Sequence, residues 1–209
     1  MLVAFEGIDG SGKSMQAKLL YARLKAKRRK VILTYEPSNG PIGGMLETAI
    51  RKDREMDNQT LQLFFTADRA YHLLYTIRPA LDNGIDVITD RYMFSTIAYG
   101  AASGLDRKWL IELNKLFPVP DFTFVLDVKP ETAMKRITER ALKFAESEAR
   151  YGLRGKAGAS RDIFETVKFL GRVRDEYIRM KKGYSRYYVI DSEEDPESTE
   201  ARIDKIINV

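Results

Sequence analysis

A phosphate-binding loop is the clearest chemical signal in the sequence. Residues 7–14 have the sequence GIDGSGKS and match the G-x-x-x-x-G-K-[ST] pattern, directly after a short apolar run and before residues with helical spacing. Glycines in such a loop let backbone N–H groups approach phosphate oxygens, and the following helix points its positive dipole end at the same anion. Lys13 is expected to reach the β- and γ-phosphates of a nucleotide, and Ser14 to ligate Mg²⁺. The predicted nucleotide-binding residues are Gly7, Ile8, Asp9, Gly10, Ser11, Gly12, Lys13 and Ser14.

A second signal is the sequence Thr89-Asp90-Arg91-Tyr92 at the end of a later apolar run. An Asp at the carboxyl end of a parallel strand beside a phosphate-binding loop faces the ligand crevice. Asp90 is therefore expected to hold Mg²⁺ or its water, and Arg91 to pair with a phosphate through two hydrogen bonds. The alternative is an ordinary salt bridge at the end of a strand.

Composition excludes several other chemistries. The 209 residues contain no cysteine and one histidine, so disulfides, thiolate nucleophiles and histidine metal clusters are ruled out. A Ser-His-Asp triad would have only His72 as its base. No apolar run approaches the ~18 residues of a membrane-spanning helix, and the N-terminus lacks the basic region of a secretory signal. We expect a cytoplasmic protein without a membrane partner.

The formal net charge of +5 is concentrated in one segment. Residues 135–161 contain eight Lys or Arg and three Asp or Glu, so the rest of the chain sums to zero. This pattern favours a local anion site over a nucleic-acid-binding face. The glycine-rich stretch 151–160 within it predicts a mobile lid, and the alternative is an ordinary surface loop. The basic run at 27–30 is interpreted as a solvated helix surface.

The elements that position these residues follow an alternating pattern. Apolar runs predict strands at 2–6, 31–35, 85–89, 122–128 and 187–190. Helical patterns follow the phosphate-binding loop and recur at about 42–53, 58–78, 106–117, 130–149, 162–182 and 197–207. Pro79 and Asn83-Gly84 are expected to end the 58–78 helix. The prediction is one α/β domain over 1–209, with a five-stranded parallel sheet, helices on both faces and a basic lid at about 135–161.

A phosphate-binding loop occurs in several classes of protein. GTPases carry an Asp-x-x-Gly switch and an Asn-Lys-x-Asp motif, but here the first pattern occurs only inside the loop itself. Asn114-Lys115 is followed by Leu116-Phe117, which does not fit the second motif. Motor ATPases need a longer chain. A small nucleotide or metabolite kinase remains.

Four segments together resemble the thymidylate kinase family: EGIDGSGKS (6–14), YEPS (35–38), LFFTADRAYH (63–72) and DRYMFSTIAYG (90–100). Their order and spacing match the family, and the similarity continues through FVLDV (124–128) to VID (189–191). The resemblance implies a P-loop kinase fold, ATP and Mg²⁺ as cofactors, dTMP as the substrate and a homodimer.

The resemblance also implies roles for individual residues. Asp9 would contact the sugar of dTMP, Phe65 would stack on the thymine ring, and Arg91 would bind the acceptor phosphate. Arg69 lies one helical turn after Phe65 on the same face. The substrate-binding residues that the resemblance implies are Asp9, Glu36, Phe65, Arg69, Arg91, Ser95 and Tyr99, with Tyr99 beside the sugar 2′ position. The alternative for Phe65 is a core residue, and His72 is expected to be structural.

Two departures from the family pattern bear on the site. Tyr35 replaces the arginine of the family's Arg-Glu-Pro turn, so any contact from that arginine is lost. The phosphate-binding loop has no arginine either, so the lid is expected to supply the arginine of the transition state. The candidates are Arg150, Arg154 and Arg161, while Arg136 and Arg140 could flank the adenine.

The predicted activity is Mg²⁺-assisted transfer of the γ-phosphoryl group of ATP to dTMP, with no nucleic acid as a partner. Positioning and charge neutralisation would supply most of the catalysis, because a monophosphate oxygen is already anionic. One alternative is a kinase of dUMP, UMP or CMP. The other is a non-enzymatic nucleotide-binding switch that engages RNA or protein through the basic lid.

Overall fold

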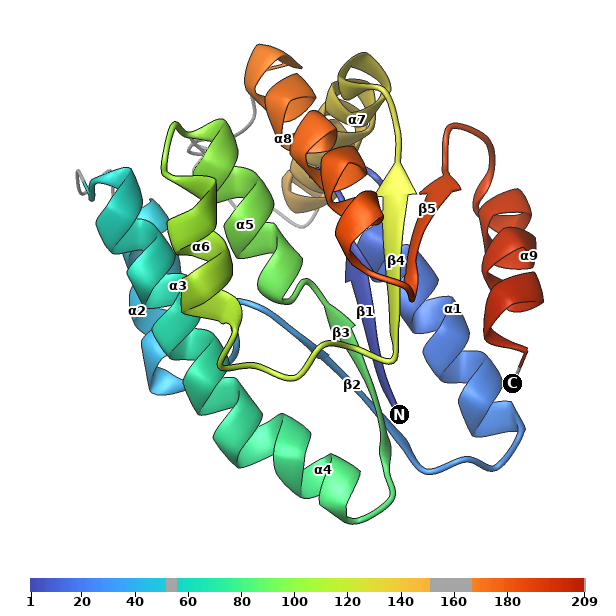
Figure 1. Ribbon diagram of the computed structural model, residues 1–209. Coiled ribbons are helices and arrows are strands. Elements are labelled where there is room, and N and C mark those ends of the chain that lie inside the picture. Colours follow the sequence, from blue (N-terminus) through green and yellow to red (C-terminus); the bar gives the residue numbers. More distant parts are fainter. Residues whose placement is uncertain (52–55, 151–166, 209) are drawn as a thin grey trace.

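The computed structural model describes residues 1–51, 56–150 and 167–208, without the side chains of 51 and 144–150 (Figure 1). Its centre is a five-stranded sheet in which every pairing is parallel, in the order β2-β3-β1-β4-β5. The strands are β1 (Leu2–Glu6), β2 (Val31–Tyr35), β3 (Asp86–Asp90), β4 (Phe122–Asp127) and β5 (Tyr187–Asp191). The predicted α/β fold with five parallel strands is confirmed.

Helices cover both faces of the sheet. The α-helices of the described residues are α1 (Lys13–Ala26), α2 (Pro41–Arg51), α3 (Asn58–His72), α4 (Arg78–Asp82), α5 (Met93–Ala102), α6 (Arg107–Asn114), α7 (Pro130–Arg150), α8 (Val167–Met180) and α9 (Pro196–Ile207). Figure 1 shows α1 and α9 together on one face, while α3, α5 and α8 lie on the other. Alternate residues of β1 enter the two cores, since Val3 packs towards α1 and Ala4 towards α5.

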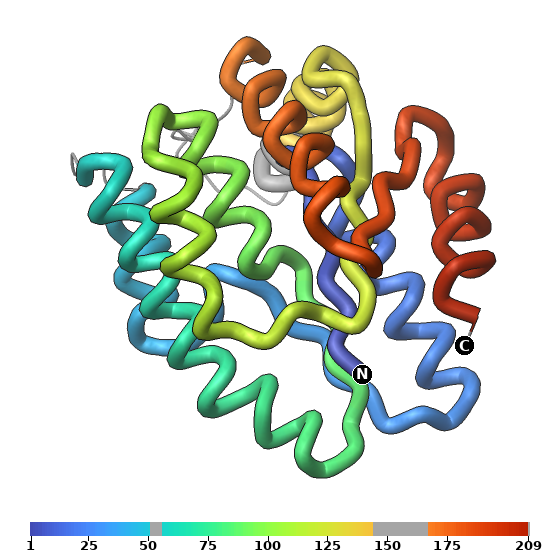
Figure 2. The backbone as a smooth tube through the Cα atoms, in the orientation of Figure 1, coloured from blue at the N-terminus to red at the C-terminus, as the bar shows by residue number. Residues whose placement is uncertain are grey.

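The sequence predicted a helix over 58–78, but the helical segment that begins at Asn58 continues past Pro79. A π-helical turn, η1 (Leu73–Ile77), joins α3 to α4, and the trace in Figure 2 continues through all three. Pro79 lies in the first turn of α4, where a missing N–H costs little. The helix ends at Asn83 and at Gly84, whose φ of 66° is left-handed.

Helix α5 was not predicted from the sequence. Eight of its ten residues are buried, so it lacks the polar face that gives a surface helix its periodic pattern. It follows β3 directly and packs against α3, α6 and α8. The pocket residues Ser95 and Tyr99 therefore lie on a buried helix.

The described part of the chain leaves the lid prediction open. Helix α7 extends to Arg150, and the predicted 162–182 helix is described from Val167 as α8. The glycine-rich stretch 151–160, which contains Arg154, lies outside the described residues, and so does Arg161. Among the described residues, no helix is long and apolar enough to cross a membrane. A short 3₁₀ turn, η2 (Lys181–Gly183), follows α8.

Candidate active site

The phosphate-binding loop joins the carboxyl end of β1 to the first turn of α1. Gly7, Gly10 and Gly12 have φ values of 132°, 79° and 98°. A Cβ at Gly7 would lie 2.6 Å from the carbonyl oxygen of Leu126, and one at Gly10 would lie 2.4 Å from that of Ala133. Both glycines are therefore required by close backbone contacts as well as by φ.

A cavity of about 800 Å³ opens over this loop. Five of the eight predicted nucleotide-binding residues line it: Asp9, Gly10, Gly12, Lys13 and Ser14. Ile8 is buried in the core, and Ser11 lines a smaller neighbouring cavity. Arg136 and Arg140 of α7 line the larger cavity on its far side, so the structure brings both of them near the loop.

Lys13 is folded back onto its own loop. Its Nζ donates to the carbonyl oxygen of Ile8 at 2.7 Å and lies 3.8 Å from a carboxylate oxygen of Asp9. Burial and the nearby charge of Arg91 lower the pKa of Lys13 to about 8, against the opposing effect of the carboxylates. A bound phosphate would supply the negative charge that Lys13 otherwise takes from the loop.

Ser14 and Asp90 form the candidate metal site. The Ser14 hydroxyl donates to Oδ2 of Asp90, and the other oxygen, Oδ1, is buried without a partner. An orphaned carboxylate oxygen beside a hydroxyl fits Mg²⁺, which takes one or two protein ligands and completes its shell with phosphate and water. Among the described residues there is no cluster of three or more His, Asp and Glu side chains that could hold a metal alone.

Asp9 and Arg91 connect the phosphate-binding loop with the next pocket. Arg91 donates to a carboxylate oxygen of Asp9 and, at 3.0 Å, to Oγ of Ser95. Tyr99 donates to the other Asp9 oxygen at 3.2 Å. Burial alone would raise the pKa of Asp9, but the charges of Arg91 and Lys13 outweigh it and lower the pKa to about 2. Asp9 is therefore a permanent anion that holds two cations in place.

A second, smaller cavity of about 120 Å³ lies beyond Arg91. All seven predicted substrate-binding residues line it, together with four more: Pro37, Ile50, Gln62 and Thr96. Phe65 is half-buried on its wall, in reach of a bound ring. The two cavities share Asp9, Glu36 and Arg91, so they adjoin at these residues.

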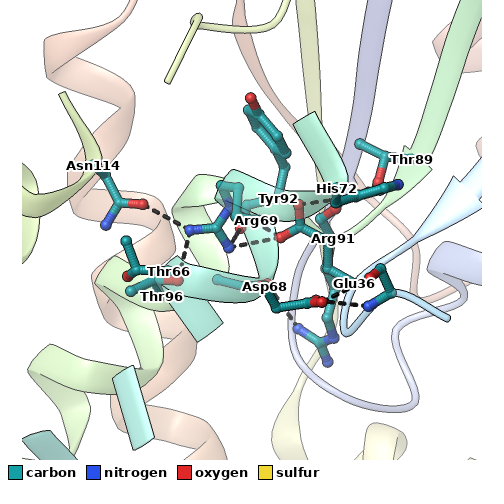
Figure 3. Close-up of polar contacts among 12 residues, drawn as sticks. Glu36, Thr66, Asp68, Arg69, His72, Thr89, Arg91, Tyr92, Thr96 and Asn114 are labelled. Carbon is teal, nitrogen blue, oxygen red and sulfur yellow. Dashed lines mark hydrogen bonds and ion pairs between the residues drawn. The ribbon is translucent and has the colours of Figure 1, made fainter. Parts of the chain in front are cut away.

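Arg69 is the centre of a buried polar network (Figure 3). Only 1% of it is exposed, and its five N–H donors all have protein partners at 2.7 to 3.0 Å. The acceptors are Glu36, which takes two of these bonds, Thr96, Asn114 and the carbonyl oxygen of Tyr92. Arg69 thus joins the turn after β2 with α5 and α6 at the wall of the second cavity.

His72 and Asp68 fix the turn that follows β2. The ring of His72 bonds to Thr34 at 2.7 Å and to Glu36 at 3.3 Å, in agreement with a structural role. Asp68 accepts from the backbone N–H and the hydroxyl of Ser38. Tyr35, which replaces the family's arginine, donates to the side chain of Asn39, so this position still braces the turn.

Glu6 is a functional candidate that the sequence analysis missed. It is fully buried and accepts from the N–H groups of Tyr92 and Ser95, at 2.9 and 3.2 Å. It also accepts from the hydroxyls of Ser95 and Tyr177, at 2.6 and 3.1 Å. Glu6, at the end of β1, therefore caps the N-terminus of α5. An acid inside an apolar run was the available signal, but its partners are distant in sequence.

The fold and the site together define a class of protein. A phosphate-binding loop after β1, a hydrogen-bonded Ser–Asp pair beside it and an adjoining cavity with a buried arginine are the parts of a P-loop kinase that acts on a small phosphorylated acceptor. The sequence model described as "Thymidylate kinase" matches residues 5–203. The chain belongs to the thymidylate kinase family.

Curated relatives agree with this assignment. The "Probable thymidylate kinase" of Sulfolobus acidocaldarius is 37% identical over 197 residues, 92% of this chain and 88% of the relative. That of Methanocaldococcus jannaschii is 37% identical over 92% of this chain and 87% of the relative, and that of Thermococcus kodakarensis 34% identical over 99% and 97%. The chain is thus a nucleoside monophosphate kinase that phosphorylates dTMP, as its motifs predicted.

Proposed function

We propose that the enzyme transfers the γ-phosphoryl group of ATP to dTMP, with Mg²⁺ held by Ser14 and Asp90. The observation that carries this proposal is the junction of the two cavities at Asp9, Glu36 and Arg91. A triphosphate over the loop and a monophosphate in the smaller cavity would meet there. Direct transfer between them needs that arrangement.

The residues at the junction act by charge and position. The loop N–H groups and Lys13 neutralise the transferred group, while Arg91 holds the acceptor phosphate beside it. Bound Mg²⁺ supplies further neutralisation of the phosphate oxygens. No residue has to act as a base, because the acceptor oxygen of a monophosphate is already ionised.

The smaller cavity is the proposed dTMP site. Phe65 offers a ring face to the base, and stacking of this kind tolerates any base. Tyr99 lies beside Asp9 and Arg91 and would crowd a 2′-hydroxyl. Crowding an added hydroxyl discriminates by about 10²-fold, so dTMP should exceed its ribose counterpart by roughly that factor.

The proposal is tested by steady-state kinetics with ATP and a panel of dTMP, dUMP, dCMP and UMP. We expect the highest kcat/KM for dTMP, and a loss of several powers of ten in kcat for Lys13→Ala and Asp90→Ala with unchanged melting. Lys115→Ala, on an exposed surface, is the matched control. Near-normal turnover in either site variant would contradict the mechanism, and another preferred monophosphate would contradict the substrate.

We also propose a homodimer formed through the outer face of α3 and η1. Leu63, Ala67, Ala70 and Leu74 are exposed at intervals of three and four residues, which makes a continuous apolar stripe. Tyr75 extends the stripe and is 63% exposed. A second copy of the chain would cover this stripe.

We also propose that the enzyme acts in the reducing cytoplasm, which the lack of cysteine fits.

Light scattering tests the homodimer. Leu74→Arg places a charge in the stripe and should give monomers at concentrations where the native enzyme is dimeric. Leu116→Arg changes an equally apolar residue that is 80% exposed elsewhere, and it should leave the mass unchanged. A native enzyme of monomer mass would refute the proposal.

A further inference from the structure

Gln62 of α3 has a buried side-chain amide without a partner. The residue is 1% exposed, and it lines the smaller cavity. Neither its Oε1 nor its Nε2 makes a hydrogen bond with the described part of the protein. Such a group is rare in folded proteins, because an unpaired buried donor or acceptor loses its hydration without compensation.

The other polar side chains of the cavity are bonded to one another. The donors of Arg69 are all directed at protein acceptors, one of which is the hydroxyl of Thr96. Asp9, Arg91, Ser95 and Tyr99 form a connected group at the opposite end. Of the described side chains around the cavity, Gln62 is the one that the structure shows with both an unused donor and an unused acceptor.

The position of Gln62 follows from its neighbours. It precedes Phe65 by three residues and therefore lies on the same face of α3. On the facing helix α5, Gly100 leaves room for it, since a Cβ there would come 3.2 Å from Cγ of Gln62. Gln62 thus lines the same cavity as the ring on which the base is proposed to stack.

We infer that the carboxamide of Gln62 binds the hydrogen-bonding edge of the pyrimidine base. In this arrangement Oε1 accepts the N3–H of thymine and Nε2 donates to an adjacent carbonyl oxygen. The inference rests on the proposed dTMP site. Phe65 stacks on any base, whereas Gln62 requires a base whose edge can form hydrogen bonds.

The kind of selectivity follows from the chemistry of the amide. A carboxamide can turn over and present its donor and acceptor in either order. Gln62 therefore selects for a base with an adjacent donor and acceptor, and it rejects a ring of the same shape that has neither. A site that hydrogen-bonds its ligand rejects such analogues strongly, because its own polar groups stay unpaired.

Gln62→Met tests the inference, because methionine keeps the length of the side chain and removes both polar atoms. We expect kcat/KM for dTMP to fall about 10- to 100-fold, mainly through KM, because the base edge loses its partners. The melting temperature should stay the same or rise, since an unpaired amide has been removed from the interior. Gln59→Met, at an exposed position of the same helix, is the matched control.

The second measurement uses the monophosphate of the 2,4-difluorotoluene deoxynucleoside, an isostere of dTMP that forms no strong hydrogen bonds. The native enzyme should prefer dTMP to this compound, and Gln62→Met should lose most of that preference. Unchanged KM for dTMP in Gln62→Met would overturn the inference. A lower melting temperature would also overturn it, because the amide would then have a structural partner. If the native enzyme fails to phosphorylate dTMP, the proposed function itself fails.

Discussion

The buried carboxylate of Glu6 gives a quantitative test of how the substrate pocket is held together. Glu6→Ala would leave the N–H group of Tyr92 buried without an acceptor, while the N–H of Ser95 keeps the carbonyl oxygen of Tyr92 at 3.1 Å. At ~1–3 kcal/mol for one such group, the expected loss in the free energy of unfolding is about 1–3 kcal/mol. Ser95 and Arg91 would also lose their alignment, so KM for dTMP should rise in the protein that remains folded.

Glu6→Gln separates the shape of this side chain from its charge. The amide oxygen can still accept from both N–H groups, so we expect a loss of only about 1 kcal/mol. Burial raises the pKa of Glu6 above 4.5, so above that pH the folded state binds more protons than the unfolded state. Between pH 4.5 and the raised pKa of Glu6, this group therefore makes the free energy of unfolding fall as pH rises. Glu6→Gln should lack this pH dependence.

The assay is equilibrium unfolding in urea, paired with KM for dTMP on the same samples. Glu112→Ala, which removes an exposed glutamate that pairs with Lys115, is the control and should change little. A loss below ~1 kcal/mol in Glu6→Ala would refute the reasoning, because it would mean that the N–H group of Tyr92 finds another acceptor.

Three further predictions concern the nucleotide site and the lid. Because the pKa of Lys13 is about 8 in the free enzyme, kcat/KM for ATP should fall above that pH. The kcat should persist to higher pH, because bound phosphates keep the proton on the amine. A flat kcat/KM up to about pH 9.5 would contradict this prediction. Between pH 8 and 10.5 the folded state binds fewer protons, so this group should make stability rise with pH. Arg150, Arg154 and Arg161 are each replaced by alanine in a separate variant, and at least one variant should lose ~10³-fold or more in kcat. Arg186→Ala is the surface control. Three variants with native kcat would mean that the lid supplies no such arginine.

Much of the fold could be predicted because its signals are local. The strands are short apolar runs, and the phosphate-binding loop has a fixed spacing of glycines before Lys13. Both kinds of signal depend on neighbouring residues alone. Asp90 could also be placed, since the carboxyl ends of parallel strands share one edge of the sheet.

The missed features depend on partners that are distant in sequence. Pro79 was expected to end a helix, but a π-helical turn moves it into the first turn of a new segment. Glu6 opens the segment EGIDGSGKS and Gln62 has no motif, but the partners of both side chains come together only when α3, α5 and β1 pack. The roles of Arg154 and Arg161 stay predictions, since they lie outside the described residues.

The burial of α5 has a consequence for the order of folding. Its first turn has no side-chain cap of its own, and its sequence contains Thr96, Ile97 and Gly100, which are weak helix formers. A ten-residue segment of this kind is unstable alone, so it needs β1, with Glu6, and the neighbouring helices in place before it can form. We therefore expect the wall that selects the substrate to form late in folding, so that interactions within α5 contribute mainly to the unfolding rate.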